Sequence, residues 1–298
     1  MKRRPPERDG FLNIDKPAGM TSRDVVDRVC RIVGSKRVGH TGTLDPLATG
    51  VLVTAVGKAT RLVEYVQAQR KVYRAGLLLG QTSDTDDVEG TILHRKLVSF
   101  PLPEVIDAAL RPLMGRIQQT PPKFSAIKVQ GKRAYDLARS GADVTMSARA
   151  VDVYRMDLLK YAPPRLELEI ECGSGTYIRS IARDLGAALG VGGLMESLER
   201  RAVGVFKRED AVGLEQLELG DWRAMTRPLL DGCADLPVME VGDQQRRHFD
   251  AGRSFLAPQS GLTQTGVFAA VQGGSFVGVG RYDAKTGVVR PFKGGFGA

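Results

Sequence analysis

The amino-acid sequence predicts an α+β protein in which helices flank a mixed, mainly antiparallel central sheet, followed by a small C-terminal β-barrel. In residues 165–172 every second residue is apolar and the residues between are charged. That alternation is typical of a strand with one buried and one solvated face. Apolar residues at positions 25, 26, 29 and 32 recur at helical spacing. Residues 238–298 combine frequent glycine with short strand-like runs, which favours a small barrel.

The other elements follow from the same two periodicities, taken in chain order. Strands are expected at residues 10–15, 50–56, 71–79, 148–159, 266–271, 275–282 and 287–291. Helices are expected from a cap at Thr21 or Ser22 to Gly34, and at residues 58–66, 103–114, 132–139 and 177–189. Residues 35–49 and 118–124 lack a period and are predicted as loops. The strands at 148–159 and 165–172 are expected to pair across the turn at Pro163 and Pro164.

Amino-acid composition and charge divide the chain of 298 residues into parts. The change near Ala234 to a glycine-rich sequence with short strand-like runs predicts a larger domain at residues 1–233 and a smaller one at residues 234–298. The formal net charge of +9 is unevenly distributed: residues 111–139 hold seven basic residues and one acidic residue, whereas residues 207–250 hold six basic and ten acidic residues. A focused positive charge favours a polyanionic ligand, and a solvated basic face is the alternative.

Composition excludes several classes of protein. A content of 42% hydrophobic and 26% charged residues excludes global disorder. The apolar runs are much shorter than the ~18 residues of a membrane helix, and the basic N-terminus has no apolar stretch behind it, so we expect no secretory signal. Cys30, Cys172 and Cys233 are far apart, which argues against a disulfide framework or a clustered zinc site. Free thiols in a reducing cytoplasm are therefore expected.

Residues 39–50, with the sequence Gly-His-Thr-Gly-Thr-Leu-Asp-Pro-Leu-Ala-Thr-Gly, are the most unusual segment of the chain. Its glycines let the backbone approach a ligand closely. Pro46 favours an extended conformation at Asp45, so this carboxylate can point out of the loop towards a ligand. The segment lacks the Gly-Lys-Ser/Thr ending of a phosphate-binding P-loop. On these residues alone, a glycine-rich turn with a turn-forming aspartate remains the other interpretation.

Three further side chains have both a chemical and a structural interpretation. Tyr73 lies in a predicted strand, where tyrosine commonly fills the core with its hydroxyl in water. Arg179 lies where a strand gives way to a helix, a place that suits a phosphate or carboxylate, or equally a surface ion pair. His40 can serve as a base or a stacking platform, or be a loop histidine without a function. The chain has no Gly-x-Ser-x-Gly nucleophile elbow.

Taken in order, these segments resemble the TruB-type tRNA pseudouridine synthases. Residues 39–50 resemble the family's catalytic motif, and its other motifs are matched at residues 12–22 (lysine–proline motif), 71–74 and 80–87 (tyrosine segment and acidic turn), 119–135 (the insertion that grips the tRNA elbow) and 172–180 (arginine motif). The resemblance implies the pseudouridine synthase fold, with a catalytic domain at residues 1–233 that includes an RNA-gripping insertion at about 111–145. Residues 234–298 resemble, less specifically, the family's PUA-like RNA-binding barrel.

The resemblance also implies a reaction, the isomerisation of uridine 55 in the T loop of tRNA to pseudouridine, with no cofactor and no metal. Asp45 is expected to be the nucleophile, whether it attacks ribose C1′, attacks base C6 or removes a ribose proton. Arg179 is expected to pair with Asp45 and lower its pKa, and Tyr73 to stack on the flipped base and take the C5 proton. The substrate-binding residues that the resemblance implies are Lys16, His40, Lys123, Lys128, Lys132, Arg133, Tyr177 and Leu198.

The same resemblance sets expectations about partners. The partner is tRNA, with no membrane and no obligate protein partner, and the protein is expected to be a cytoplasmic monomer. One departure concerns Glu199, which occupies a position that is basic in the family, so phosphate contacts there are in doubt. Two alternatives remain: an RNA-binding or tRNA-folding protein independent of catalysis, and a guide-dependent ribosomal RNA synthase. The intact Asp45, Tyr73 and Arg179 argue against the first, and the complete insertion argues against the second.

Overall fold

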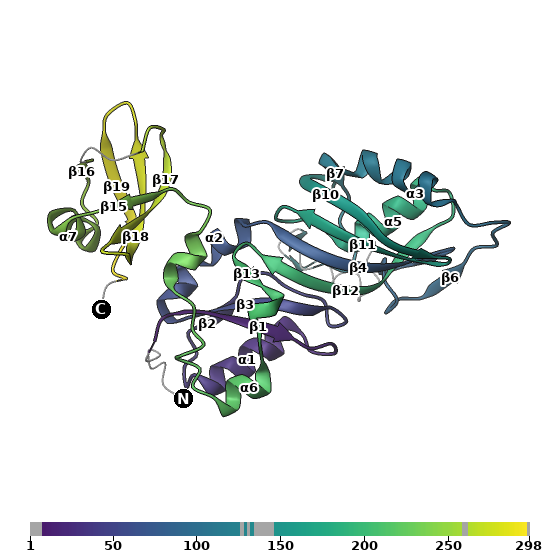
Figure 1. Ribbon diagram of the computed structural model, residues 1–298, viewed down its shortest axis with the longest axis horizontal. Coiled ribbons are helices and arrows are strands. Elements are labelled where there is room, and N and C mark those ends of the chain that lie inside the picture. Colours follow the sequence, from purple (N-terminus) through teal and green to yellow (C-terminus); the bar gives the residue numbers. More distant parts are fainter. Residues whose placement is uncertain (1–7, 126–127, 130–131, 134–145, 258–261, 297–298) are drawn as a thin grey trace.

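A ten-stranded sheet forms the centre of the protein, for which a computed structural model describes residues 8–125, 128–129, 132–133, 146–257 and 262–296 (Figure 1). Its strands are β1 Gly10–Lys16, β2 Val38–His40, β3 Thr49–Val56, β4 Lys71–Leu79, β7 Gly115–Gln119, β10 Arg149–Ala162, β11 Arg165–Cys172, β12 Gly193–Val203, β13 Phe206–Lys207 and β14 Val212–Gly213. They follow the order β14-β1-β3-β12-β4-β11-β10-β7, with β2 beside β3 and β13 beside β12. Two pairs, β1 with β14 and β3 with β12, are parallel, and the other pairs are antiparallel. The predicted mixed, mainly antiparallel sheet is therefore confirmed.

Most helices lie against this sheet or at its ends, and α7 lies beside the C-terminal strands (Figure 1). They are α1 Ser22–Ile32, α2 Val63–Ala68, α3 Pro103–Leu110, α5 Ile178–Ala188, α6 Leu214–Leu219 and α7 Asp243–Ala251, together with the 3-10 turns η1 Gly57–Leu62, η2 Arg111–Leu113, η3 Arg208–Asp210 and η4 Leu229–Cys233. Helix α1 begins with a capping box, in which the Thr21 hydroxyl accepts from the Asp24 N–H and the Asp24 carboxylate accepts from the Thr21 N–H.

The largest apolar core lies between one face of the sheet and helices α1, α3, α5 and α6. These helices contribute, among others, Val25, Val29, Ile106, Leu110, Ile178, Ile181, Leu185, Leu214 and Leu217, and all of them are buried. On β11 the alternation predicted from the sequence decides the face: Leu166, Leu168 and Ile170 face this core. The residues between them face solvent, where Arg70 and Arg155 pair with Glu171 and Glu169 on the reverse face of the sheet. Burial of one face and ion pairing on the other fix the register of β11 in the sheet.

A five-stranded sheet follows, formed by β15 Val238–Glu240, β16 Phe255–Leu256, β17 Gly266–Gln272, β18 Ser275–Asp283 and β19 Val288–Lys293. Its order is β15-β17-β18-β19-β16, and it curls into a half-barrel at one end of the molecule (Figure 1). Among the described residues no pairing of β15 with β16 closes the barrel. The predicted C-terminal barrel is thus present in a half-closed form.

Two further cores hold this half-barrel in place. A core on its own contains Phe249 of α7 together with Phe268, Val277 and Val289 of the strands. A second core is shared with the central sheet, because Phe11, Val53 and Phe206 form one buried cluster with Phe276 and Phe296. An ion pair between Lys293 and Glu64, 2.7 Å long, lies beside this shared core.

Most predicted elements are found, and the differences are local. The loop predicted at 35–49 contains strand β2, and the loop predicted at 118–124 begins inside β7. The helix predicted at 58–66 is divided into η1 and α2. The helix predicted at 132–139 is wrong at its start, where residues 132–133 form strand β9 and pair with β8 Lys128–Val129, and its remainder lies outside the described residues. A small ribbon of β5 Gln81–Ser83 and β6 Ile92–His94 completes the strands.

The periodicity did not reveal β7, α6 and α7, nor strand β12, although β12 lies at the centre of the sheet. Two irregularities in its pairing with β4, between Met195 and Ser197 and between Arg200 and Ala202, shift the phase of its alternation. Its contact with β3 requires glycine at position 50, since Gly50 has φ +92° and an added Cβ would lie 2.4 Å from the Arg200 carbonyl oxygen.

The shared core yields a prediction. Phe206 is fully buried and its ring lies 5.7 Å from that of Phe11, so Phe206→Ala should lower the free energy of unfolding by roughly 3–5 kcal/mol. Phe292→Ala is the control, because Phe292 is 48% exposed, and it should change little. The measurement is denaturant unfolding followed by circular dichroism. If Phe206→Ala lowered the free energy of unfolding as little as Phe292→Ala does, the shared core would contribute nothing to stability.

Candidate active site

The loop that carries Asp45 is fixed by backbone and hydroxyl hydrogen bonds on both sides of the aspartate. The Ser22 hydroxyl, at the start of α1, accepts from the Leu44 N–H at 2.8 Å and donates to the Leu44 carbonyl at 3.1 Å. After the aspartate, the Gly19 N–H donates to the Pro46 carbonyl at 2.8 Å, and the Ala48 N–H donates to the Asp45 carbonyl at 3.1 Å. Helix α1 and the turn before it therefore hold the loop in one conformation.

Lys16, at the end of β1, anchors the same loop from inside the protein. Its side chain is fully buried, and the ammonium donates to the carbonyls of Pro17, Pro46 and Ala48 at 2.9, 3.2 and 2.6 Å. Burial lowers the pKa of Lys16 to about 8, with Asp45 acting in the opposite direction. The predicted place of Lys16 in the pocket wall thus corresponds to a position beneath the loop, where it satisfies three carbonyl oxygens.

Asp45 and Arg179, which are 134 residues apart, form a two-point ion pair. The Arg179 Nε lies 3.0 Å from Asp45 Oδ2, and Nη2 donates to Asp45 Oδ1 at 3.3 Å. Arg179 projects from the first turn of α5 and its side chain is 7% exposed, whereas that of Asp45 is 32% exposed. Such paired contacts orient a carboxylate as well as attract it. The pairing of Asp45 with Arg179 that the resemblance implied is therefore present in the structure.

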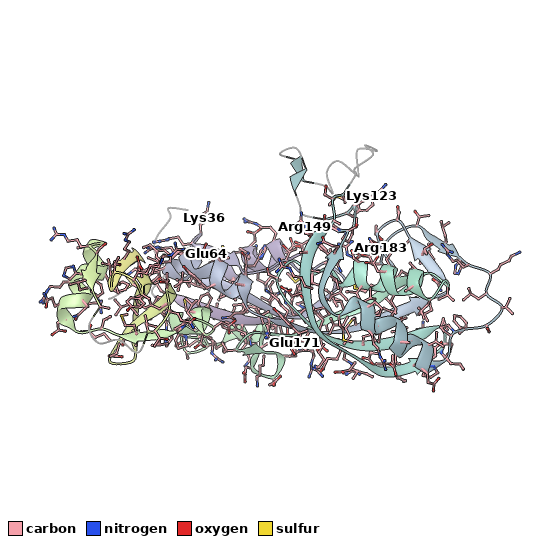
Figure 2. All side chains as sticks on the ribbon, turned by 90° about the horizontal axis from the view of Figure 1, so that it is seen from above. Lys36, Glu64, Lys123, Arg149, Glu171 and Arg183 are labelled. Atoms are coloured by element: carbon pink, nitrogen blue, oxygen red, sulfur yellow. The ribbon has the colours of Figure 1, made fainter. Side chains whose placement is uncertain are left out.

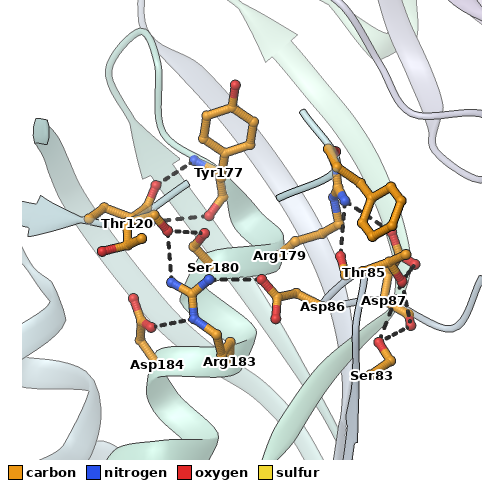
Figure 3. A network of polar contacts seen from close by, with 12 residues as sticks. Ser83, Thr85, Asp86, Asp87, Thr120, Tyr177, Arg179, Ser180, Arg183 and Asp184 are labelled. Atoms are coloured by element: carbon orange, nitrogen blue, oxygen red, sulfur yellow. Dashed lines mark hydrogen bonds and ion pairs between the residues drawn. The ribbon is translucent and has the colours of Figure 1, made fainter. Parts of the chain in front are cut away.

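The same guanidinium has three further partners. Nη1 donates to the Thr85 carbonyl at 2.9 Å and lies 3.5 Å from the carboxylate of Asp87, while Nη2 donates to the Phe124 carbonyl at 3.0 Å. Asp87 is 4% exposed in its side chain and also accepts from the Thr85 hydroxyl at 2.6 Å. Figure 3 shows this network around Arg179 and α5. Arg179 thereby joins the loop of Asp45, the acidic turn and the segment after β7.

The expected lowering of the pKa of Asp45 is wrong in its net direction. Burial raises the pKa of Asp45 above its ordinary value, and this effect exceeds the lowering by Arg179. Asp87 also raises the pKa of Asp45, because it places a second carboxylate beside the same guanidinium, and Lys16 lowers it. The arginine acts in the predicted sense, but removal of water from the carboxylate costs more than the ion pair returns.

Tyr73 lies in β4 on the face of the sheet that carries the largest core, beside the same group of charges. Burial raises the pKa of Tyr73, and the positive charge of Arg200, its register partner on β12, acts in the opposite direction. Arg200 is itself buried and donates from Nε to the Val51 carbonyl at 2.7 Å and from Nη2 to the Gly42 carbonyl at 3.1 Å. Arg200 therefore lies beside Tyr73 in the sheet and binds both ends of the loop that contains Asp45.

The remaining predicted pocket residues lie on strands β12 and β2 and at the start of α5. Leu198 of β12 is buried next to Ala75 of β4, on the same face as Tyr73. His40 ends β2; burial lowers its pKa, and its Nδ1 is buried without a hydrogen-bond partner among the described residues. Tyr177 precedes α5, and its backbone exchanges two hydrogen bonds with the Gln119 side chain, at 2.8 and 3.1 Å.

The basic residues of the insertion are only partly described. Lys123 is exposed and lies towards one edge of the molecule, with Glu171 at the opposite edge (Figure 2). Lys128, Lys132 and Arg133 lie in the paired strands β8 and β9.

Glu199 lies opposite Arg74 in the register of β12 and β4, on the face opposite Leu198. Its carboxylate lies 3.4 Å from Arg208. The acidic departure at position 199 thus points away from Asp45.

Sequence reasoning missed several residues of this site. Asp87 belonged to the recognised acidic turn but received no role, and Arg200 and Gln119 received none. A charged or amide side chain inside an apolar or motif-bearing segment was the available signal, since such groups are buried only where partners exist. Among the described residues no cluster of three or more His, Cys, Asp or Glu side chains could hold a metal ion.

Comparison with known proteins identifies the family. The model of the TruB family pseudouridylate synthase (N terminal domain) matches residues 30–178, which include Asp45 and Tyr73. The model of the tRNA pseudouridylate synthase B C-terminal domain matches residues 179–231. The chain belongs to the TruB family. It is accordingly a pseudouridylate synthase, an isomerase, and the fold and activity expected from the sequence motifs are confirmed at that level.

Individual relatives agree with the family match. The chain is 44% identical to the tRNA pseudouridine synthase B of Thermobifida fusca over 270 residues, which cover 88% of this chain and 91% of the relative. It is 50% identical to that of Acaryochloris marina over 211 residues, covering 70% and 73% of the two chains. A Cbf5-Nop10-Gar1 complex contains a chain with a TM-score of 0.73 and 25% identity, covering 92% of this chain and 78% of that one. The TruB family therefore accounts for most of the chain.

One further structural property concerns membranes. In the part of the chain that the structure describes, no helix has the length and apolarity that crossing a membrane requires.

The contribution of the Lys16 hydrogen bonds can be tested by measuring the free energy of unfolding. Lys16→Met removes the donor of three carbonyls and should lower the free energy of unfolding at pH 7 by roughly 1–3 kcal/mol, whereas Lys36→Met, at an exposed position, should not. Lys16 has a pKa of about 8 in the fold and an ordinary value of 10.5. At a pH between these two pKa values, Lys16 binds more protons in the unfolded chain than in the folded protein. The free energy of unfolding of the wild-type protein relative to Lys16→Met should therefore rise with pH. A difference that stays constant from pH 7 to pH 10 would contradict burial of the ammonium.

Proposed function

We propose that this protein converts uridine at position 55, in the T loop of tRNA, to pseudouridine, with Asp45 as the nucleophile. The observation that carries the proposal is the two-point ion pair of Asp45 with Arg179, at 3.0 and 3.3 Å, on a carboxylate that remains one-third exposed. The relatives are named tRNA pseudouridine synthase B, which supports tRNA as the substrate. The motif order of the sequence supports the T-loop uridine.

The reaction conserves all atoms. The glycosidic bond between uracil N1 and ribose C1′ breaks, the base rotates, and a bond forms between C5 and C1′. The proton on C5 is lost, and N1 gains a proton. No external oxidant, reductant or group donor takes part, so the protein must supply a nucleophile, a proton acceptor and a pocket that holds the detached base.

Asp45 is suited to the first of these roles. The carboxylate acts only in its ionised form, and Arg179 favours that form against the opposing effects of burial and of Asp87. Because the ion pair leaves part of the carboxylate exposed, an incoming ribose can be met without breaking both contacts with Arg179. The activity should therefore decline as pH falls through the raised pKa of Asp45.

Tyr73, Leu198 and Tyr177 would form the walls around the flipped base. Unstacking a base from an RNA loop costs a few kcal/mol, and stacking on an aromatic ring recovers about 1–3 kcal/mol. Tyr73 would supply that ring and accept the C5 proton, beside the positive charge of Arg200. His40, which the lowered pKa keeps neutral, would occupy the gap that the departing base leaves in the T loop.

The RNA-binding surface is proposed to include Lys123, Lys128, Lys132 and Arg133. Residues 1–233, with the insertion at about 111–145, would form the catalytic domain, and residues 234–298 would add RNA affinity without chemistry. A monomer in the cytoplasm, acting without an obligate protein partner, completes the proposal. Neither a metal nor an organic cofactor enters the steps given above.

The substitution Asp45→Asn tests the chemistry. The amide is nearly the same size but neutral and a poor nucleophile, so release of tritium from tRNA labelled at uridine C5 should cease while filter binding of tRNA persists. Arg179 keeps Asp87 as a partner, so the loss of stability should not exceed about 1–3 kcal/mol. Asp157→Asn, which removes another arginine-paired aspartate on the reverse face, should remain active. Tritium release by Asp45→Asn would refute the proposed nucleophile, whereas tRNA refolding that survives in this variant would point to a separate folding activity.

Salt dependence tests the RNA-binding surface. Replacing Lys123, Lys128, Lys132 and Arg133 by glutamine should flatten the slope of log affinity against log salt by about 3, at roughly 0.7–0.9 for each phosphate contact. The control removes the same charge from the reverse face, by replacing Arg70, Arg74, Arg155 and Arg165 with glutamine, and its slope should change much less. If both quadruple variants have the same slope, the insertion does not contact phosphates.

A further inference from the structure

The acidic turn contains a backbone conformation that calls for an explanation. Asp86 has φ of +62° and is the only non-glycine residue with positive φ in the described ranges. This left-handed conformation is unfavourable for an aspartate and persists where surrounding contacts enforce it. Two such contacts are on the backbone, since the Asp86 carbonyl accepts from the Met195 N–H at 3.0 Å and its N–H donates to the Ser83 carbonyl at 3.4 Å.

The third contact is an ion pair with Arg183. Arg183 Nη1 lies 2.8 Å from Asp86 Oδ2, and the aspartate side chain is only 13% exposed. Arg183 stands one helical turn after Arg179 on α5, and Figure 3 shows the two arginines reaching the acidic turn from the same helix. Burial of the Asp86 carboxylate is therefore compensated by a partner that belongs to the same helix as the partner of Asp45.

The left-handed residue divides the contacts of the turn between the two arginines. Its neighbours on both sides face Arg179: the Thr85 carbonyl accepts at 2.9 Å, and the Asp87 carboxylate lies at 3.5 Å. Its own side chain reaches Arg183 instead. A right-handed conformation at position 86 would change the direction of the chain between Thr85 and Asp87, and both could not then meet the same guanidinium.

Arg183 also connects the turn to the segment after β7. Its Nη2 donates to the Thr120 carbonyl at 2.8 Å, and the Ser180 hydroxyl donates to the same carbonyl at 2.9 Å (Figure 3). Four residues further on, the Phe124 carbonyl accepts from Arg179. The two arginines therefore hold the same two segments, the acidic turn and residues 120–124, at neighbouring levels of α5.

We propose that Asp86 and Arg183 are positioning residues for the isomerisation: their ion pair fixes the turn so that Thr85 and Asp87 hold the Arg179 guanidinium against Asp45. Neither side chain is assigned a contact with the reacting uridine. The inference rests on the proposed function for its effect on rate, but its effect on Asp45 can be observed in the protein without RNA.

The direction in which the pKa of Asp45 changes when Asp86 is replaced distinguishes a positioning role from a direct effect of the Asp86 charge. The groups that act on or lie beside Asp45 are Arg179 on α5, Asp87 and Glu89 in the turn, Lys16 on β1, Tyr73 on β4 and Tyr177 before α5. Asp86→Asn removes a negative charge, which by direct electrostatics would lower the pKa of Asp45. If Asp86 positions Arg179, the same substitution loosens the ion pair and raises the pKa of Asp45.

The experiment titrates the Asp45 carboxyl by carbon NMR, with the resonance assigned through Asp45→Asn. Arg183→Met and Asp86→Asn should each raise the pKa of Asp45 by about 0.5–1 unit, and the double variant should raise it no further, because both act through one ion pair. Arg165→Met is the control: it breaks a 3.0 Å ion pair with Glu196 on the reverse face and should leave the titration unchanged. An unchanged or lowered pKa in Asp86→Asn would overturn the proposal.

Kinetics provide the second readout. In single-turnover tritium release, Arg183→Met and Asp86→Asn should slow the reaction about 10–100-fold and move the acid limb of the pH profile upwards, with tRNA affinity within about threefold of wild-type. Weakened binding at an unchanged rate would assign Arg183 to RNA contact instead and overturn the proposal. A wild-type protein without tritium release would refute the proposed function, and the NMR titration would still decide the positioning role.

Discussion

The candidate site depends on one buried guanidinium. Arg179 binds Asp45, Asp87, the Thr85 carbonyl and the Phe124 carbonyl at distances from 2.9 to 3.5 Å. Removing a charged group from water costs several kcal/mol, which is recovered only where the partners have good geometry. Three segments far apart in sequence must therefore be in place before the arginine is satisfied, and the site is completed together with the tertiary fold.

The two cations near Asp45, Lys16 and Arg179, have different structural roles. Lys16 binds carbonyl oxygens alone and fixes where the loop lies, whereas Arg179 binds carboxylates and fixes how Asp45 is oriented. Because the lysine is satisfied by neutral acceptors, most of the compensating charge at Asp45 comes from the arginine. The competition between burial and Arg179 then sets the pKa of Asp45, which makes the precision of the guanidinium's placement chemically important.

The sequence predicted what depends on local pattern. Alternation located β4 and β11, and motif order singled out Asp45, Tyr73 and Arg179 before any coordinates. It could not predict β12, because bulges shift its phase, nor the net direction of the Asp45 pKa, because that balance depends on burial. The roles of Asp87 and Arg200 were also hidden, since their partners lie on other strands and loops, and single-residue patterns contain no information on such distant contacts.

The core shared by Phe11, Phe206, Phe276 and Phe296 fixes the distance between the half-barrel and the candidate site. A half-barrel joined only by a linker could swing and accept RNAs of many shapes. Here, however, one face of the half-barrel packs against the central sheet through this shared core, and the Lys293–Glu64 ion pair lies beside it. The shared core holds the two parts in one relative position, so on the proposed function an RNA that contacted both would have to bring its uridine to Asp45 at a fixed distance from the half-barrel.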